Sequence, residues 1–236
     1  MNDIKGIIFD YGGTIDSRGV HWSEVIWNGY LDTGVNISKD EFRQSYVMAE
    51  RELAKVRHIL PHHNFLDLLR IKMRIELGDL IARGILPADF PLEEKTEQIA
   101  MFCYQSAKTC VEEARPVLDA LSARYPMALV SNFYGNVESV LADFDLLRYF
   151  PSIVESAVVG VRKPDPKIFA LGVEALGLSA NEVLVIGDSL KKDIIPAESL
   201  GCKVLWLKGK GWTADEDAQT HPCTIASIGE VLQKID

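Results

Sequence analysis

The 236-residue chain has no long hydrophobic run and no excess of positive charge. Without an apolar stretch of about 18 residues, no membrane-spanning helix is expected. The formal net charge of −9, with no local basic patch to offset it, disfavours nucleic acid and anionic membranes as partners. Repeats and low-complexity segments are also missing. Hydrophobic residues at 47% and charged residues at 25% are typical of a globular protein with a sizeable core.

Cysteine is scarce and scattered. No two cysteines form a C-x-x-C pair, which argues against a zinc site and a disulfide framework. The four are Cys103, Cys110, Cys202 and Cys223. The chain also lacks the cationic and then apolar pattern of a secretory leader. We therefore expect reduced thiols and a cytoplasmic protein.

Four short apolar runs predict buried parallel strands. They are residues 5–10, 127–132, 182–188 and 202–209. Helical patterns lie between the later runs and begin near Pro166 and Asp193. Alternation of strand and helix predicts an α/β fold with a doubly wound parallel sheet, a Rossmann-like core.

More than a hundred residues separate the first two predicted strands, and their pattern is helical almost throughout. Ser38 and Glu41, for example, form a capping box ahead of one helical segment. A crossover between parallel strands needs only about a dozen residues. The excess predicts an inserted all-helical cap domain at 17–108, with the core formed by 1–16 and 109–236.

Polar side chains gather where ligands bind in doubly wound sheets, beyond the carboxyl ends of the strands. They belong to Asp10, Ser131, Asn132, Asp188 and, in the loop GVRKPDP, Lys163. The carboxylates of Asp10 and Asp188 are hard oxygen ligands suited to Mg²⁺. A carboxylate beside a phosphoryl group can also attack it, which gives an aspartyl-phosphate. Lys163 and Ser131 would hold the phosphoryl oxygens.

Four motifs, FDYGGT, VSN, RKPDP and IGDSLKKD, occur in this order along the chain. Together they resemble the motifs of the haloacid dehalogenase-like hydrolase superfamily, most of whose members are phosphatases. The resemblance implies Asp10 as nucleophile, Ser131 and Lys163 as phosphoryl ligands, and Asp188 and Asp193 as Mg²⁺ residues. It also implies that the helical insert resembles the family's cap of the first type, which closes over the site and selects a small phosphorylated metabolite.

One position departs from the family's pattern. The family's first motif, D-x-D-G-T, has a second aspartate that protonates the leaving group and later activates water, and Gly12 stands in its place. Because the family's residue binds Mg²⁺ through its backbone carbonyl, Gly12 is expected to remain a metal ligand. General acid–base catalysis contributes about a hundred- to ten-thousand-fold. Its loss should slow hydrolysis when the leaving group is poor.

Three interpretations of Gly12 stay open. The protein is a phosphatase that favours good leaving groups or borrows an acid from the cap. Alternatively, it resembles the phosphonatase branch, in which a cap lysine forms a Schiff base, and Lys55 is a candidate. In the third interpretation it binds phosphorylated ligands without turnover. A metal-free dehalogenase is disfavoured, because Asp188 and Asp193 keep the acidic form of the last motif.

The remaining candidates lie near the first motif and the cap. Gly13 is expected to permit a tight turn with positive φ. Thr14 should pin that turn or offer phosphate its backbone N–H, and His21 lies where the cap must pass over the site. Asp16 and the segment KGKGW at 208–212 are expected to be solvated. The substrate-binding set is therefore Gly13, Thr14, Asn132 and His21.

Overall fold

Within residues 3–235, which the computed structural model describes, six parallel strands form one sheet in the order β3-β2-β1-β4-β5-β6. The strands are β1 Gly6–Phe9, β2 Met127–Ser131, β3 Ser152–Glu155, β4 Val183–Gly187, β5 Lys203–Leu207 and β6 Thr224–Ile225. The four predicted strands are all present, and the doubly wound parallel sheet is confirmed. Sequence patterns missed β3 and β6, which are short.

The central strand β1 pairs with β2 on one side and β4 on the other. All residues of these three strands are buried, as expected for a parallel sheet covered on both faces. In the register, Phe9 lies beside Leu129 and Ile186. The residues that follow β1, β2 and β4 therefore emerge at the same edge, at the switch in strand order where ligands bind.

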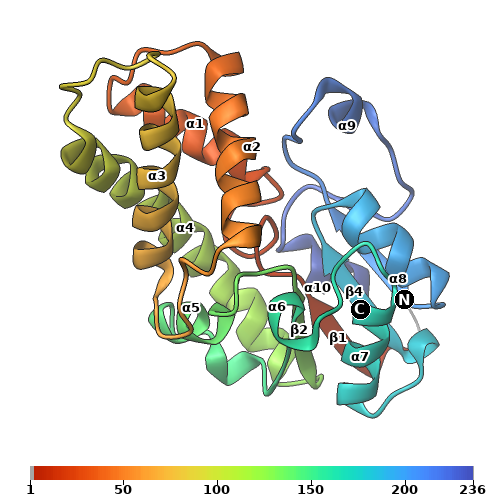
Figure 1. Ribbon diagram of the computed structural model, residues 1–236. Helices are drawn as coiled ribbons and strands as arrows, with labels where there is room; N and C mark the ends of the chain where they lie inside the picture. Colours follow the sequence, from red (N-terminus) through yellow and green to blue (C-terminus); the bar gives the residue numbers. More distant parts are fainter. Residues whose placement is uncertain (1–2, 236) are drawn as a thin grey trace.

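Helices cover both faces of the sheet (Figure 1). One face, which includes Ile8 and Val130, packs against α7 and α8, and the other, which includes Phe9 and Leu129, packs against the second half of α4, α5 and α10. The remaining elements of the core are short. The helices of the core are α5 Val137–Asp143, α6 Ser156–Val159, α7 Lys167–Leu176, α8 Ile195–Ser199, α9 Ala214–Ala218 and α10 Glu230–Ile235, with single turns at Leu147–Tyr149, Ala180–Glu182 and Leu190–Ile194.

The long segment between β1 and β2 is helical and stands to one side of the sheet (Figure 1). Its helices are α1 Trp22–Asp32, α2 Lys39–Lys55, α3 Phe65–Ala82 and α4 Leu92–Ser122. The predicted capping box of Ser38 and Glu41 is present at the start of α2. The predicted border at 108/109 falls inside α4, an uninterrupted helix of 31 residues. The polypeptide thus returns to the core through α4 itself.

Residues 208–223, between β5 and β6, carry α9 away from the sheet (Figure 1), and the part of this segment before α9 reaches α2. Trp212 in this segment packs against the rings of His21 and Tyr46, with centroids 5.3 and 5.4 Å away. Arg43 on α2 donates a 2.7 Å hydrogen bond to the Trp212 carbonyl. The expectation of a solvated loop at 208–212 holds only in part, because Lys210 is exposed whereas Trp212 packs on His21 and Tyr46 and so joins core and cap.

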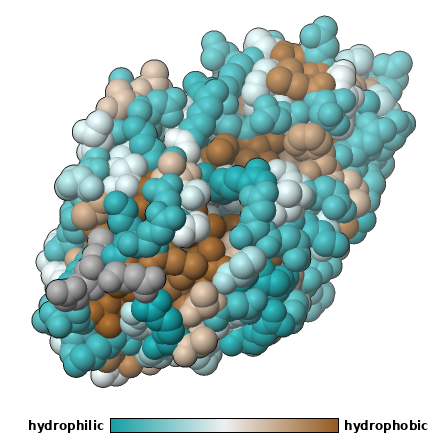
Figure 2. Space-filling view, turned by 180° about the vertical axis from the view of Figure 1, so that it is seen from behind, coloured by the Kyte–Doolittle hydropathy of each residue, from teal (hydrophilic) through white to brown (hydrophobic). Residues whose placement is uncertain are grey.

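Of the helices between residues 3 and 235, none combines the length and the apolarity that crossing a membrane requires. On the face seen in Figure 2, hydrophilic residues dominate, and hydrophobic ones appear in several separate patches. The four cysteines are all unpaired, as predicted.

Candidate active site

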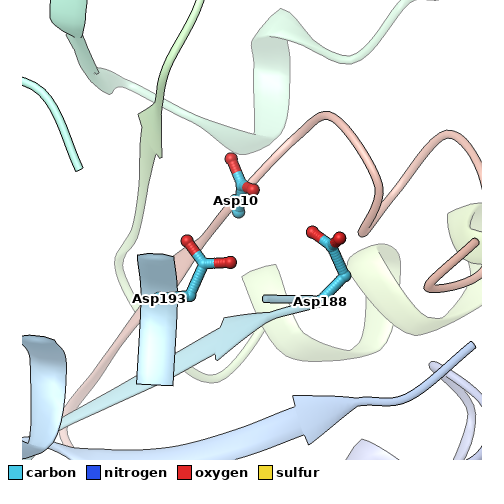
Figure 3. A group of neighbouring side chains, drawn as sticks. All are labelled: Asp10, Asp188 and Asp193. Atoms are coloured by element: carbon cyan, nitrogen blue, oxygen red, sulfur yellow. The ribbon is translucent and has the colours of Figure 1, made fainter. Parts of the chain in front are cut away.

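Three carboxylates meet at the carboxyl edge of the sheet. Asp10 directly follows β1, Asp188 directly follows β4, and Asp193 lies in the π-helical turn Leu190–Ile194 that leads into α8. One ligand atom of each lies within 4.8 Å of the others. Figure 3 shows the side chains of Asp10, Asp188 and Asp193 around a common space. The pairing of β1 with β4 places Asp10 and Asp188 side by side.

Lys163 lies among these carboxylates. Its Nζ is 2.8 Å from Asp10 Oδ1 and 2.7 Å from Asp193 Oδ1, and the residue is 3% exposed. Asn132 fixes the backbone that carries it. The Asn132 amide donates to the Lys163 carbonyl at 3.1 Å, and its Oδ1 accepts the Lys163 N–H at 2.9 Å. The side chain of Asn132 therefore holds the backbone of Lys163 in place, which is a role beyond the ligand contact that the sequence predicted.

The electrostatics of the cluster favour a bound cation. Burial raises the pKa of Asp10, an effect that the charge of Lys163 opposes. Burial and the neighbouring carboxylates of Asp193 and Asp10 raise the pKa of Asp188 well above its usual value. Three carboxylates beside one ammonium leave an excess of negative charge that a divalent cation would neutralise. The donors are hard oxygens at an open edge, the kind of set that Mg²⁺ binds.

The turn after Asp10 approaches Asp188 closely. Gly13 has φ +96°, and a Cβ built on it would lie 2.4 Å from the Asp188 carboxylate, so only glycine fits there. Thr14 Oγ1 donates to Asp188 Oδ1 at 3.2 Å. Gly12 is different, because a Cβ there would have no other heavy atom within 4 Å. Space for a side chain therefore exists at position 12. The glycine there removes a carboxylate from the site without being required by the packing.

Asp16 is 1% exposed, so the expectation of a solvated turn residue is wrong. Its Oδ1 accepts the Gly13 N–H at 2.7 Å, and the Trp22 indole N–H donates to the carboxylate at 3.1 Å. Burial raises the pKa of Asp16 to about 7. It does not line the cavity described next, so its contacts tie the turn to the start of α1.

A cavity of about 290 Å³ lies between the core and the cap helices. Asp10, Gly12, Gly13, Lys163, Asp188 and Asp193 line it on the core side. Apolar side chains of the cap helices line the opposite wall, among them Ile26, Phe65, Leu68 and Leu69. Ser131, the last residue of β2, is 1% exposed and is not part of the lining, and its phosphoryl-binding role stays a prediction.

His21 lines the cavity where the cap begins, at the position expected for it. Its Nδ1 accepts the Ser23 N–H at 3.2 Å and so caps α1. Burial, and then the charges of Lys192 and Lys72, lower the pKa of His21 to about 4. The imidazole is therefore neutral near pH 7.

Among the residues of the cavity wall that sequence analysis missed, three lie in contact with one another. Lys72 on α3, Glu50 on α2 and Tyr134 after β2 form one connected group. A signal existed for Lys72, because it occupies the buried stripe of α3 with Leu68 and Leu69, at helical spacing. The partners of Lys72 come from other elements and carry no comparable signal.

Comparison with known proteins agrees with this architecture. A family model described as haloacid dehalogenase-like hydrolase matches residues 4–201. The chain is 39% identical over 82 residues to haloacid dehalogenase-like hydrolase domain-containing protein 3 from Danio rerio, which covers 35% of this chain and 34% of that protein. It is 31% identical over 129 residues to glyceraldehyde 3-phosphate phosphatase from Pyrococcus abyssi, which covers 51% of this chain and 53% of that protein.

These alignments span about a third to a half of each relative. Similarity of the fold, in contrast, extends over the whole chain. The magnesium-bound hydrolase YfnB from Bacillus subtilis superposes with a TM-score of 0.62 at 16% identity, with both chains covered in full. Since the family match contains all four motifs and the three clustered aspartates, the chain belongs to the haloacid dehalogenase-like hydrolase family.

Proposed function

We propose that this hydrolase is a Mg²⁺-dependent phosphatase that removes the phosphoryl group from a small phosphorylated metabolite. The observation that carries the proposal is the buried pair of Asp10 and Lys163, which faces a cavity beside two further carboxylates. Glyceraldehyde 3-phosphate phosphatase is among the similar proteins, which supports a phosphate ester as substrate.

The contacts of Asp10 select the attacking oxygen. Oδ1 accepts the Tyr11 N–H at 2.7 Å and lies 2.8 Å from Lys163 Nζ. Among the residues that the structure describes, no hydrogen bond to Oδ2 is found. Oδ2 is thus the oxygen that attacks phosphorus. As the new bond forms, the bond from phosphorus to the leaving-group oxygen breaks, and that oxygen keeps the electron pair.

The aspartyl-phosphate formed on Asp10 is then hydrolysed by water, which releases phosphate and restores the carboxylate. Asp10, Asp188, Asp193 and the backbone carbonyl of Gly12 would hold Mg²⁺, whose charge lowers the repulsion between the carboxylate and the phosphoryl oxygens. Lys163 neutralises further charge at the same point. Without a carboxylate at position 12, the leaving group departs unprotonated, which favours substrates with good leaving groups.

The proposal assigns different roles to two parts of the chain. Residues 17–108 form the cap that covers the site, and residues 1–16 and 109–236 form the catalytic core, with α4 as the rigid junction. The unpaired cysteines support a reducing compartment, the cytoplasm.

The phosphonatase alternative loses its candidate lysine. Lys55 is exposed and does not line the cavity. Lys72 lines it, and burial alone would lower its pKa, but Glu50 and the other neighbouring groups together raise the pKa well above its usual value. A permanently protonated amine is a poor nucleophile for a Schiff base.

Asp10→Asn tests the proposal. Phosphate release from 4-nitrophenyl phosphate with Mg²⁺ should fall by about a thousandfold or more, because the amide cannot act as the nucleophile. Asp89→Asn, at an exposed carboxylate, is the matched control and should keep full activity. Unchanged turnover in a folded Asp10→Asn variant would refute the nucleophile assignment. Mg²⁺-dependent thermal stabilisation by phosphate without any product would instead identify a binding protein.

A further inference from the structure

A buried lysine of the cap lies on the cavity wall. Lys72 on α3 is 4% exposed, and its Nζ pairs with a carboxylate oxygen of Glu50. Nζ also lies 4.3 Å from the centroid of the Tyr46 ring. An ammonium group has three N–H donors. These contacts engage one carboxylate and one ring face, so the group retains a donor for a ligand in the cavity.

The position of Lys72 is fixed from both sides of the cavity. Tyr134, which follows β2 in the core, donates from its hydroxyl to Glu50 Oε1 at 2.9 Å. Glu50 thus links the cap lysine to the core. An ammonium held in this way binds a ligand with little further loss of side-chain entropy.

A second lysine lies on the cavity wall. Lys192 lines the cavity together with Lys72, and the glutamates of the lining are Glu50 and Glu216. Burial is the main cause of the low pKa of the neighbouring His21, and the charges of Lys192 and Lys72 lower this pKa further. An anionic group on a ligand would be stabilised here.

Part of the cavity wall that the cap forms is apolar. Ile26, Phe65 and Leu68 line the cavity and are at most 3% exposed, and they offer side chains without hydrogen-bonding groups. A sugar, with a hydroxyl on nearly every carbon, would lose hydrogen bonds with water against such a surface. A ligand with an apolar body fits it better.

We propose that Lys72 binds a carboxylate on the leaving group, and that the substrate class is phosphorylated hydroxy acids with an apolar body. This inference rests on the proposed phosphatase function for its phosphoryl end. The phosphoryl group faces Asp10 and Lys163, the apolar body lies against the cap helices, and the carboxylate pairs with Lys72.

The experiment measures binding without turnover. Two non-hydrolysable ligands, 4-carboxybenzylphosphonate and its neutral twin 4-carbamoylbenzylphosphonate, are titrated by calorimetry into the full-length protein with Mg²⁺. A charge-assisted hydrogen bond should make the carboxylate bind about ten- to a hundredfold more tightly. Lys72→Met should bring this ratio to about one, whereas Lys72→Arg should keep a preference for the carboxylate. Lys55→Met, at the exposed cap lysine, is the control and should keep the full ratio.

Equal binding of the twins by the wild-type protein overturns the assignment of Lys72, and that result does not depend on whether a variant folds. Survival of the full preference in Lys72→Met overturns it as well. Phosphate release from 4-carboxyphenyl and 4-carbamoylphenyl phosphate separates the two proposals. Equal release from both esters keeps the phosphatase and removes the carboxylate site. A Lys72-dependent binding preference without any phosphate release keeps the site and removes the phosphatase.

Discussion

Replacing Gly12 by aspartate should give this protein the acid that the family's first motif supplies. A Cβ at Gly12 has no other heavy atom within 4 Å, and the position lines the cavity beside Asp10. The backbone there is outside the left-handed region, in contrast to Gly13 with its φ of +96°. The substitution therefore introduces a carboxyl group without displacing a neighbour.

The expected gain depends on the leaving group. General acid catalysis contributes about a hundred- to ten-thousand-fold when the leaving oxygen must be protonated. An alkyl phosphate belongs to that class, so we expect Gly12→Asp to raise its kcat/KM by at least about a hundredfold. With 4-nitrophenyl phosphate the leaving oxygen departs as a stabilised anion. The gain there should stay below about tenfold.

Initial rates of phosphate release with Mg²⁺ measure both effects on the same protein preparation. Gly12→Asn is the matched control, because its side chain has almost the same size and cannot donate a proton as an acid. It should leave the ratio of alkyl to aryl rates unchanged. An unchanged ratio in a folded Gly12→Asp variant, or an equal rise in Gly12→Asn, would show that the missing acid does not limit turnover.

Further predictions concern metal binding and stability. Gly13→Ala should weaken Mg²⁺ binding in calorimetry, because its Cβ would lie 2.4 Å from the Asp188 carboxylate, whereas Gly12→Ala should not; equal affinities would contradict the steric reasoning. Burial raises the pKa of Glu76 to about 8. The folded state therefore holds this proton while the unfolded chain releases it, and wild-type stability should fall as pH rises from about 4.5 to about 8. Glu76→Gln removes this pH dependence. The free energy of urea unfolding of the variant, relative to that of the wild type, should therefore rise by about 3 kcal/mol between pH 5 and pH 8. A constant difference across that range would argue against a proton on Glu76.

The sequence predicted which residues meet at the candidate site, because the signals for this edge of the sheet are local. Asp10 and Asp188 each follow a short, wholly apolar run, and such runs indicate the buried strands of a parallel sheet. Strand order at the switch point then brings the two strand ends together. The edge strand β6 has only two residues and escaped prediction, since no periodicity can be read from so short a segment.

Burial of single polar residues could not be predicted in the same way. Asp16 follows a glycine turn, where a solvated aspartate is the usual finding, yet the Trp22 indole covers it and donates to it. Lys72 lies in a helix that contains several charged residues, and its partners Glu50 and Tyr134 are 22 and 62 positions away. Such contacts depend on how the helices pack, which no local pattern encodes.

In our proposal, closure of the cap and selection of the substrate depend on the same contacts. Tyr134 of the core reaches Glu50 of α2, and Lys210 of the core lies 3.3 Å from Glu24 of α1. Opening the cap would break these contacts and leave the pair of Lys72 and Glu50, which lies within the cap, without its link to the core. In the proposed mechanism, no carboxyl group at position 12 is present to protonate a poor leaving group. Selection of the substrate then depends on two properties of the leaving group. These are the stability of its anion and the chemical group that it places beside Lys72 when the cap is closed.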